Sequence, residues 1–214
     1  MRENHGRTAF GRVGAATNRS RGVRRVVPLT LGWCEVPYSM SVAGAPGDAR
    51  LREPVPALLL ETADGWVLVD TGFNPAFVRD PALRRRFHTS TGVEVWLPGD
   101  PSPDGSGGAD EDPLLVELAR VGLTVGDLAA VVITHLHNDH AGGLRHLAGT
   151  GVPIHVQRAE LEYGLHAPPP GPEHDGIIRV DFDDPTLTWR LADDDVPIAP
   201  GVTALRTAGH TPGH

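Results

Sequence analysis

The most informative segment of the sequence is Thr134-His135-Leu136-His137-Asn138-Asp139-His140-Ala141-Gly142-Gly143, residues 134–143. It follows a short apolar run from Ala130, which predicts a buried strand. Three imidazoles and a carboxylate therefore stand within six positions at the end of a strand. Such a cluster gains nothing from packing, whereas a divalent cation stabilises all of its members. We interpret the segment as a metal-binding one.

The spacing within the cluster indicates how its side chains converge. In an extended backbone His135 and His137 point the same way, so both imidazoles can bind one ion. Asp139 and His140 follow after the chain turns and can face a neighbouring ion. Imidazole and carboxylate donors without thiolate favour Zn²⁺, with Fe, Mn or Co as alternatives.

The flanking sequence predicts an α/β arrangement of helices and strands. A β-hairpin is expected from residues 55–61 and 66–70 around the turn Ala63-Asp64-Gly65. Apolar spacing predicts further strands and helices. The strands are expected at 130–134, 154–157, 187–191 and 202–207, and the helices at 114–121, 141–147 and 158–165. The polar cluster then lies at the carboxyl end of a buried strand, where ligand sites of such sheets are found.

The motif His135-x-His137-x-Asp139-His140-Ala-Gly-Gly resembles that of the metallo-β-lactamase superfamily. Two further stretches match in order, Asp70-Thr71-Gly72 upstream and Thr207-Ala-Gly-His-Thr-Pro-Gly-His214 downstream. Val156-Gln-Arg-Ala-Glu160 adds a likeness to the N-acyl-homoserine-lactonase-like group. The resemblance covers residues 28–214 and implies an αββα sandwich, an α/β fold, with two Zn²⁺ ions in a complete site.

The resemblance also implies roles for individual residues. One metal would be held by His135, His137 and His210, and a second by Asp139 and His140. His214 is expected to be a neighbour of the site rather than a ligand. Asp70 would orient a ligand through a hydrogen bond, the alternative being a plain turn aspartate.

The family pattern continues beyond the stretches that match here. The resemblance implies a bridging aspartate and a last histidine after His214, so we expect the fold to be incomplete at its C-terminus and poorly stable. None of the remaining histidines in the 88–174 region is an obvious replacement; these are His88, His146, His155, His166 and His174. We expect a disordered arginine-rich head over residues 1–27 and one domain over 28–214.

The resemblance implies a metal-dependent hydrolase that opens the ring of an N-acyl homoserine lactone or a similar small ester. Asp139 would be the catalytic residue, passing a proton to the departing alkoxide. Other enzymes of the fold, such as a glyoxalase II-like thioesterase, a phosphodiesterase or a β-lactam hydrolase, remain alternatives, as does a catalytically inert fragment. Substrate contacts are expected from residues 33–40 and 75–95.

Composition excludes several classes of protein. The 214 residues carry a net charge of -8, which argues against a nucleic-acid binder. The arginines of the head are interpreted as a disordered leader or a misplaced start, the alternative being a tail for nucleic acid or a membrane surface. No long apolar run predicts a membrane span, so a cytoplasmic location is expected. The single Cys34 predicts a small buried hydrophobe, and no oligomeric state is indicated.

Overall fold

The computed structural model describes residues 22–46, 48–87, 93–100, 111–169 and 176–214. Most of the arginine-rich head, and the candidates His88 and His174, lie outside these residues. The first strand begins at Arg25, ahead of the expected domain start at residue 28, and pairs there with Glu61.

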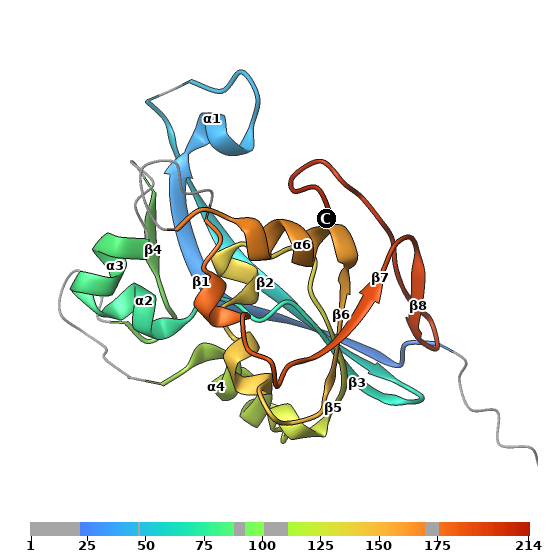
Figure 1. Ribbon diagram of the computed structural model, residues 1–214. Coiled ribbons are helices and arrows are strands. Elements are labelled where there is room, and N and C mark those ends of the chain that lie inside the picture. Colours follow the sequence, from blue (N-terminus) through green and yellow to red (C-terminus); the bar gives the residue numbers. More distant parts are fainter. Residues whose placement is uncertain (1–21, 47, 88–92, 101–110, 170–175) are drawn as a thin grey trace, which may run out of the picture.

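The centre of the fold is one mixed sheet of order β4-β1-β2-β3-β5-β6-β7 (Figure 1). The strands span, in sheet order, Glu94–Trp96, Arg25–Pro37, Arg50–Thr62, Gly65–Val69, Leu128–Val132, Pro153–Gln157 and Thr188–Ala192. Strands β4 to β3 pair antiparallel, whereas β3, β5, β6 and β7 are parallel. The parallel strands end at one edge, and the segment that follows β5 there carries His135, His137 and His140.

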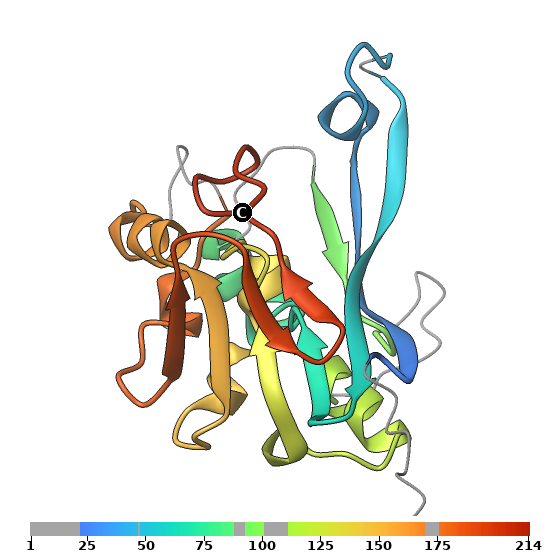
Figure 2. The same ribbon diagram turned by 90° about the vertical axis from the view of Figure 1, so that its right-hand side faces the viewer.

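Strand β2 is longer than the sequence analysis expects, and β1 is a strand that it does not predict. The expected strand 55–61 is the second half of β2, and β1 pairs with β2 from Arg25 through Pro37. The two strands form an arm that extends beyond the rest of the sheet, with helix α1, Tyr38–Ser41, at its tip (Figure 2). This arm forms one wall of the pocket described below.

Short helices connect the strands. They are α2 (Pro75–Arg79), α3 (Pro81–Phe87), α4 (Pro113–Arg120), α5 (Asn138–Ala141) and α6 (Arg158–His166), with 3-10 turns η1 (Val125–Asp127), η2 (Leu144–Leu147) and η3 (Arg179–Asp181). The expected helix 141–147 is wrong: the chain forms α5 and η2 with Gly142-Gly143 between them. A Cβ on Gly142 would lie 2.1 Å from the backbone nitrogen of Asn74, so the glycines permit close approach to the loop after β3.

The main core lies between the sheet and its helices. Leu118 of α4 and Leu161 of α6 pack in one cluster with Leu68 and Val131 of the sheet. Figure 1 shows α4 and α6 on one side of the sheet and the second small sheet on the other. That sheet pairs β8 (Val196–Ala199) with β9 (Val202–Ala204), so the expected strand 202–207 ends early. No helix of the described residues is both long and apolar enough to cross a membrane.

Candidate metal centre

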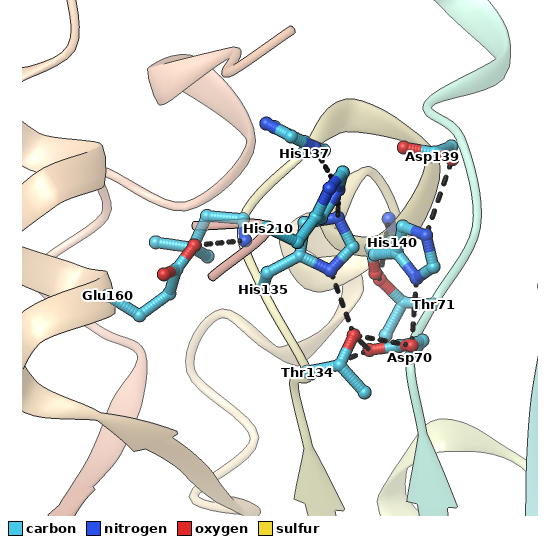
Figure 3. A network of polar contacts seen from close by, with 11 residues as sticks. Asp70, Thr71, Thr134, His135, His137, Asp139, His140, Glu160 and His210 are labelled. Carbon is cyan, nitrogen blue, oxygen red and sulfur yellow. Dashed lines mark hydrogen bonds and ion pairs between the residues drawn. The ribbon is translucent and has the colours of Figure 1, made fainter. Parts of the chain in front are cut away.

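Three separate segments deliver the polar side chains of the site. Asp70 and Thr71 follow β3, residues 134–140 follow β5 and lead into α5, and His210 lies in the loop after β9 (Figure 3). Because β3 and β5 are adjacent parallel strands, their carboxyl ends place the first two segments side by side. The loop after β9 then brings His210 to them.

His135, His137 and His210 form the first candidate metal-binding group. The Nε2 of His210 lies 3.2 Å from Nε2 of His135 and 3.1 Å from Nδ1 of His137. Burial, with repulsion from His140 and His137, lowers the pKa of His135 to about 2, so this imidazole is neutral at neutral pH. Ring nitrogens that converge in this way present lone pairs to a common point, so the group fits a divalent cation.

His135, Asp139 and His140 form the second candidate group, so His135 belongs to both. Nε2 of His140 lies 3.3 Å from Oδ2 of Asp139. Burial favours the neutral imidazole, but the carboxylates of Asp139 and Asp70 outweigh it and raise the pKa of His140 to about 10. Burial alone would raise the pKa of Asp139, but the attraction of His140 lowers it well below its usual range. A bound metal ion would take the place of the proton that His140 and Asp139 share.

Asp70, at the end of β3, orients side chains of both candidate metal-binding groups. Its φ of 62° is the left-handed conformation that lets the chain turn at the end of β3. Oδ2 of Asp70 lies 2.8 Å from Nδ1 of His140, and Oδ1 accepts the backbone N–H of Thr134 at 2.9 Å. The Thr134 hydroxyl in turn lies 3.0 Å from Nδ1 of His135. Asp70 thus contacts one candidate ligand directly, as expected, and reaches another through Thr134.

Glu160 is a residue of the site that the sequence analysis missed. Its fully buried side chain accepts the backbone N–H of Leu136 at 2.8 Å through Oε1. Its Oε2 accepts the Thr211 hydroxyl at 2.6 Å and the Gly213 N–H at 3.1 Å. One carboxylate therefore joins the loop of His135 to the loop of His210. A signal was present, because Glu160 ends the stretch Val156-Gln-Arg-Ala-Glu160, which carries part of the likeness to the lactonase-like group.

The other histidines lie apart from the two groups. Nδ1 of His214 lies 2.8 Å from the Thr207 hydroxyl, and its ring centroid is 5.3 Å from that of His135, which fits the expected role of a neighbour. His146 contacts Asp112 at the start of α4, whereas His155 lies in β6 and His166 ends α6. Neither group draws on these three residues.

The candidate metal centre opens into a pocket of about 290 Å³. Its floor consists of the five residues of the two groups, and its walls come from the arm, the loop after β3 and β4. Cys34, Val36 and Met40 of the expected segment 33–40, and Val93 and Val95 of the expected segment 75–95, line these walls. Cys34 is half-buried against the apolar cluster of Val95, so it is a small hydrophobe that also faces the pocket.

Comparisons with known proteins give one consistent result. Residues 50–214 match the family described as the Metallo-beta-lactamase superfamily. The chain is 36% identical to an N-acyl homoserine lactonase of Bacillus thuringiensis over 90% of this chain and 68% of that protein. It is 32% identical to an N-acyl homoserine lactonase of Agrobacterium fabrum, over 75% of this chain and 57% of that protein.

A solved structure of an N-acyl homoserine lactone hydrolase, with N-hexanoyl-L-homoserine bound at its catalytic metal centre, superposes with a TM-score of 0.73. The two share 30% sequence identity, over 90% of this chain and 69% of that one. A probable metal-dependent hydrolase from Staphylococcus aureus is similar in fold, with a TM-score of 0.58 at 20% identity over 89% of this chain and 66% of that one. The mixed sheet described above is therefore the fold of these hydrolases.

Proposed function

Because the chain belongs to the metallo-beta-lactamase superfamily, we propose that it is a zinc-dependent hydrolase that opens the ring of an N-acyl homoserine lactone. The observation that carries the proposal is the convergence of His135, His137 and His210 at the floor of a pocket with apolar walls. The curated relatives at 36% identity are N-acyl homoserine lactonases, which supports the choice of substrate class.

Each of the five candidate ligands has a place in this proposal. His135, His137 and His210 hold one Zn²⁺, and Asp139 with His140 contributes to a second. Bound Zn²⁺ supplies a water molecule of lowered pKa and polarises the lactone carbonyl. One imidazole nitrogen cannot serve two ions, so His135 is assigned to the first group, where its Nε2 faces His210.

Asp139 is the residue we assign to proton transfer. It lines the pocket, and its lowered pKa keeps the carboxylate ionised at neutral pH. When water attacks the carbonyl, one proton passes to Asp139, the C–O bond of the ring breaks, and the proton returns to the departing alkoxide. No covalent enzyme intermediate is required by this sequence.

The pocket walls favour a neutral acyl substrate over a phosphodiester. Val36, Met40, Phe73 and Val95 present apolar surface, and no arginine stands among the described lining residues. A phosphodiester would require cationic or strongly donating side chains. An acyl chain gains from burial against such a wall.

Ring opening can be measured directly through the proton that it releases. The zinc-loaded chain is assayed on N-hexanoyl homoserine lactone with a pH indicator, and an acyl thioester serves as the comparison substrate. We expect lactone turnover that falls at least about 100-fold in His137→Ala and persists in His166→Ala, whose imidazole is exposed on α6. Thioester hydrolysis faster than lactone hydrolysis, or turnover retained in His137→Ala, would contradict the proposal.

A further inference from the structure

One wall of the pocket carries a carboxylate that the proposed reaction does not use. Cys34 of β1 pairs with Glu53 of β2 and with Val95 of β4. Directly paired residues of neighbouring strands share a face of a sheet, so these three side chains lie on one face of the arm. All three line the pocket of the candidate metal centre.

On the opposite face of the arm, a charged side chain packs against aromatic rings. Arg52, next to Glu53 in the sequence, points the other way, and its guanidinium lies 4.7 Å from the ring centre of Trp33 and 4.4 Å from that of Trp96. Arg52 is thus held between two aromatic rings and is directed away from Glu53. Arg52, the cationic residue next to Glu53 in the sequence, therefore does not pair with the Glu53 carboxylate.

Glu53 has no polar partner in the part of the chain that the structure describes. It is half-buried, and neither the hydrogen bonds nor the ion pairs of these residues include its carboxylate. The same pocket is lined by the apolar side chains of Val36, Met40, Phe73 and Val95 and by the hydroxyl-bearing Ser41. A half-buried carboxylate without a protein partner keeps its oxygens available to a donor group of a bound molecule.

Cys34 indicates where Glu53 stands relative to the metal-binding side chains. Burial raises the pKa of the Cys34 thiol to about 12, with further contributions from the carboxylates of Asp139 and Glu53. The thiol therefore lies close enough to both carboxylates to be affected by each. Glu53 and Asp139 line the same pocket, so one bound substrate can present its carbonyl to Asp139 and a donor group to Glu53.

We propose that Glu53 determines specificity by accepting a hydrogen bond from a hydroxyl group on the acyl chain of the substrate, so that hydroxyacyl lactones are preferred to unsubstituted ones. This inference rests on the proposed lactonase function of the same pocket. An anionic substituent would be repelled by the carboxylate. A cationic one would lose hydration against Val36, Met40 and Phe73, so a neutral donor on an otherwise apolar chain fits this wall best.

The test measures binding separately from turnover. The probes are two lactams of equal chain length, N-hexanoyl and N-(3-hydroxyhexanoyl), in which N–H replaces the ring oxygen so that hydrolysis is suppressed. Their affinities for the zinc-loaded chain are determined by calorimetry in the wild type, Glu53→Gln, Glu53→Leu and the control Glu94→Gln. Glu94 is an exposed residue of β4 on the opposite face of the arm.

We expect the wild type and Glu94→Gln to bind the hydroxylated lactam at least about tenfold more tightly than the plain one, the lower end of what a hydrogen bond to a charged group contributes. Glu53→Leu should lose this preference and bind the plain lactam more tightly, and Glu53→Gln should fall between. Thermal unfolding of each variant shows whether it is folded.

The inference would be overturned if the ratio of the affinities for the two lactams were the same in the wild type and in Glu53→Leu. If the affinity ratios are equal and lactone hydrolysis is normal, only the assignment of Glu53 is wrong. If the chain neither binds the lactams nor hydrolyses the lactone, the proposed function is wrong as well. A retained preference in Glu53→Leu would place the hydroxyl on another group.

Discussion

Replacing Glu160 with glutamine tests whether one buried carboxylate holds the metal centre together. Oε1 of Glu160 accepts the Leu136 N–H, and Oε2 accepts the Thr211 hydroxyl and the Gly213 N–H. A glutamine has the same shape but turns one oxygen into an NH₂ donor. Whichever way the amide lies, its NH₂ faces the N–H of either Leu136 or Gly213, so a backbone donor loses its acceptor.

The magnitude follows from the hydrogen bonds that the substitution removes or weakens. A hydrogen bond to a charged group contributes about 1.5–3 kcal/mol, and a buried donor without an acceptor costs about 1–3 kcal/mol. The removal of one such bond and the weakening of those that remain lower the free energy of unfolding by about 2–4 kcal/mol. Domains are stable by only about 5–15 kcal/mol, so the effect is large.

Urea unfolding monitored by circular dichroism gives the stability, and competition with a chelator gives the zinc affinity. We expect Glu160→Gln to lower the urea midpoint and to weaken zinc binding about 10- to 100-fold, because the loop of His210 loses its connection to the loop of His135. The control is Glu162→Gln, an exposed residue on the same helix. A change in stability below about 0.5 kcal/mol together with unchanged zinc affinity would show that Glu160 does not join the two loops.

Three further changes have defined outcomes. Burial raises the pKa of Asp181 to about 7, so between about pH 4 and 7 the folded chain keeps a proton that the unfolded chain has lost. The free energy of unfolding therefore falls as pH rises through this window, by up to about 4 kcal/mol, and Asp181→Asn should abolish that fall in urea titrations at pH 4 and 8. A Cβ at position 142 would lie 2.1 Å from the backbone nitrogen of Asn74, so Gly142→Ala should lower the free energy of unfolding by about 3 kcal/mol and lower the melting temperature. An unchanged melting temperature would contradict the close approach. Asp70→Asn removes a carboxylate 2.8 Å from Nδ1 of His140 and should weaken zinc binding about 10-fold in chelator competition. An unchanged zinc affinity would show that Asp70 serves only the turn after β3.

Local sequence patterns predicted the parts of the fold whose causes are local. The hairpin of β2 and β3 follows from two apolar runs around a glycine turn, and the cluster 135–140 follows a short buried strand. The break at Gly142-Gly143 was not predicted, because only contact with the loop after β3, remote in sequence, makes a continuous helix impossible there.

Long-range pairing determined what the sequence left open. The length of the β1–β2 arm depends on register with a distant strand, and Pro28 and Pro54 within these strands weaken any local strand pattern. The function of Glu160 depends on donors in a loop 51 and 53 residues away. Glu53 faces the pocket because the arm forms one of its walls, which the neighbours of Glu53 in the sequence do not indicate.

The role of the metal centre is tested most directly by titrating Zn²⁺ into the metal-free chain, with the initial rate of lactone ring opening measured at each addition. If the histidine cluster holds the ion that hydrolysis requires, the rate starts near zero, rises in proportion to bound zinc and stays near zero throughout in His210→Ala. Full ring opening by the metal-free chain, or an equal response to zinc in His210→Ala, would contradict the assignment of the metal centre.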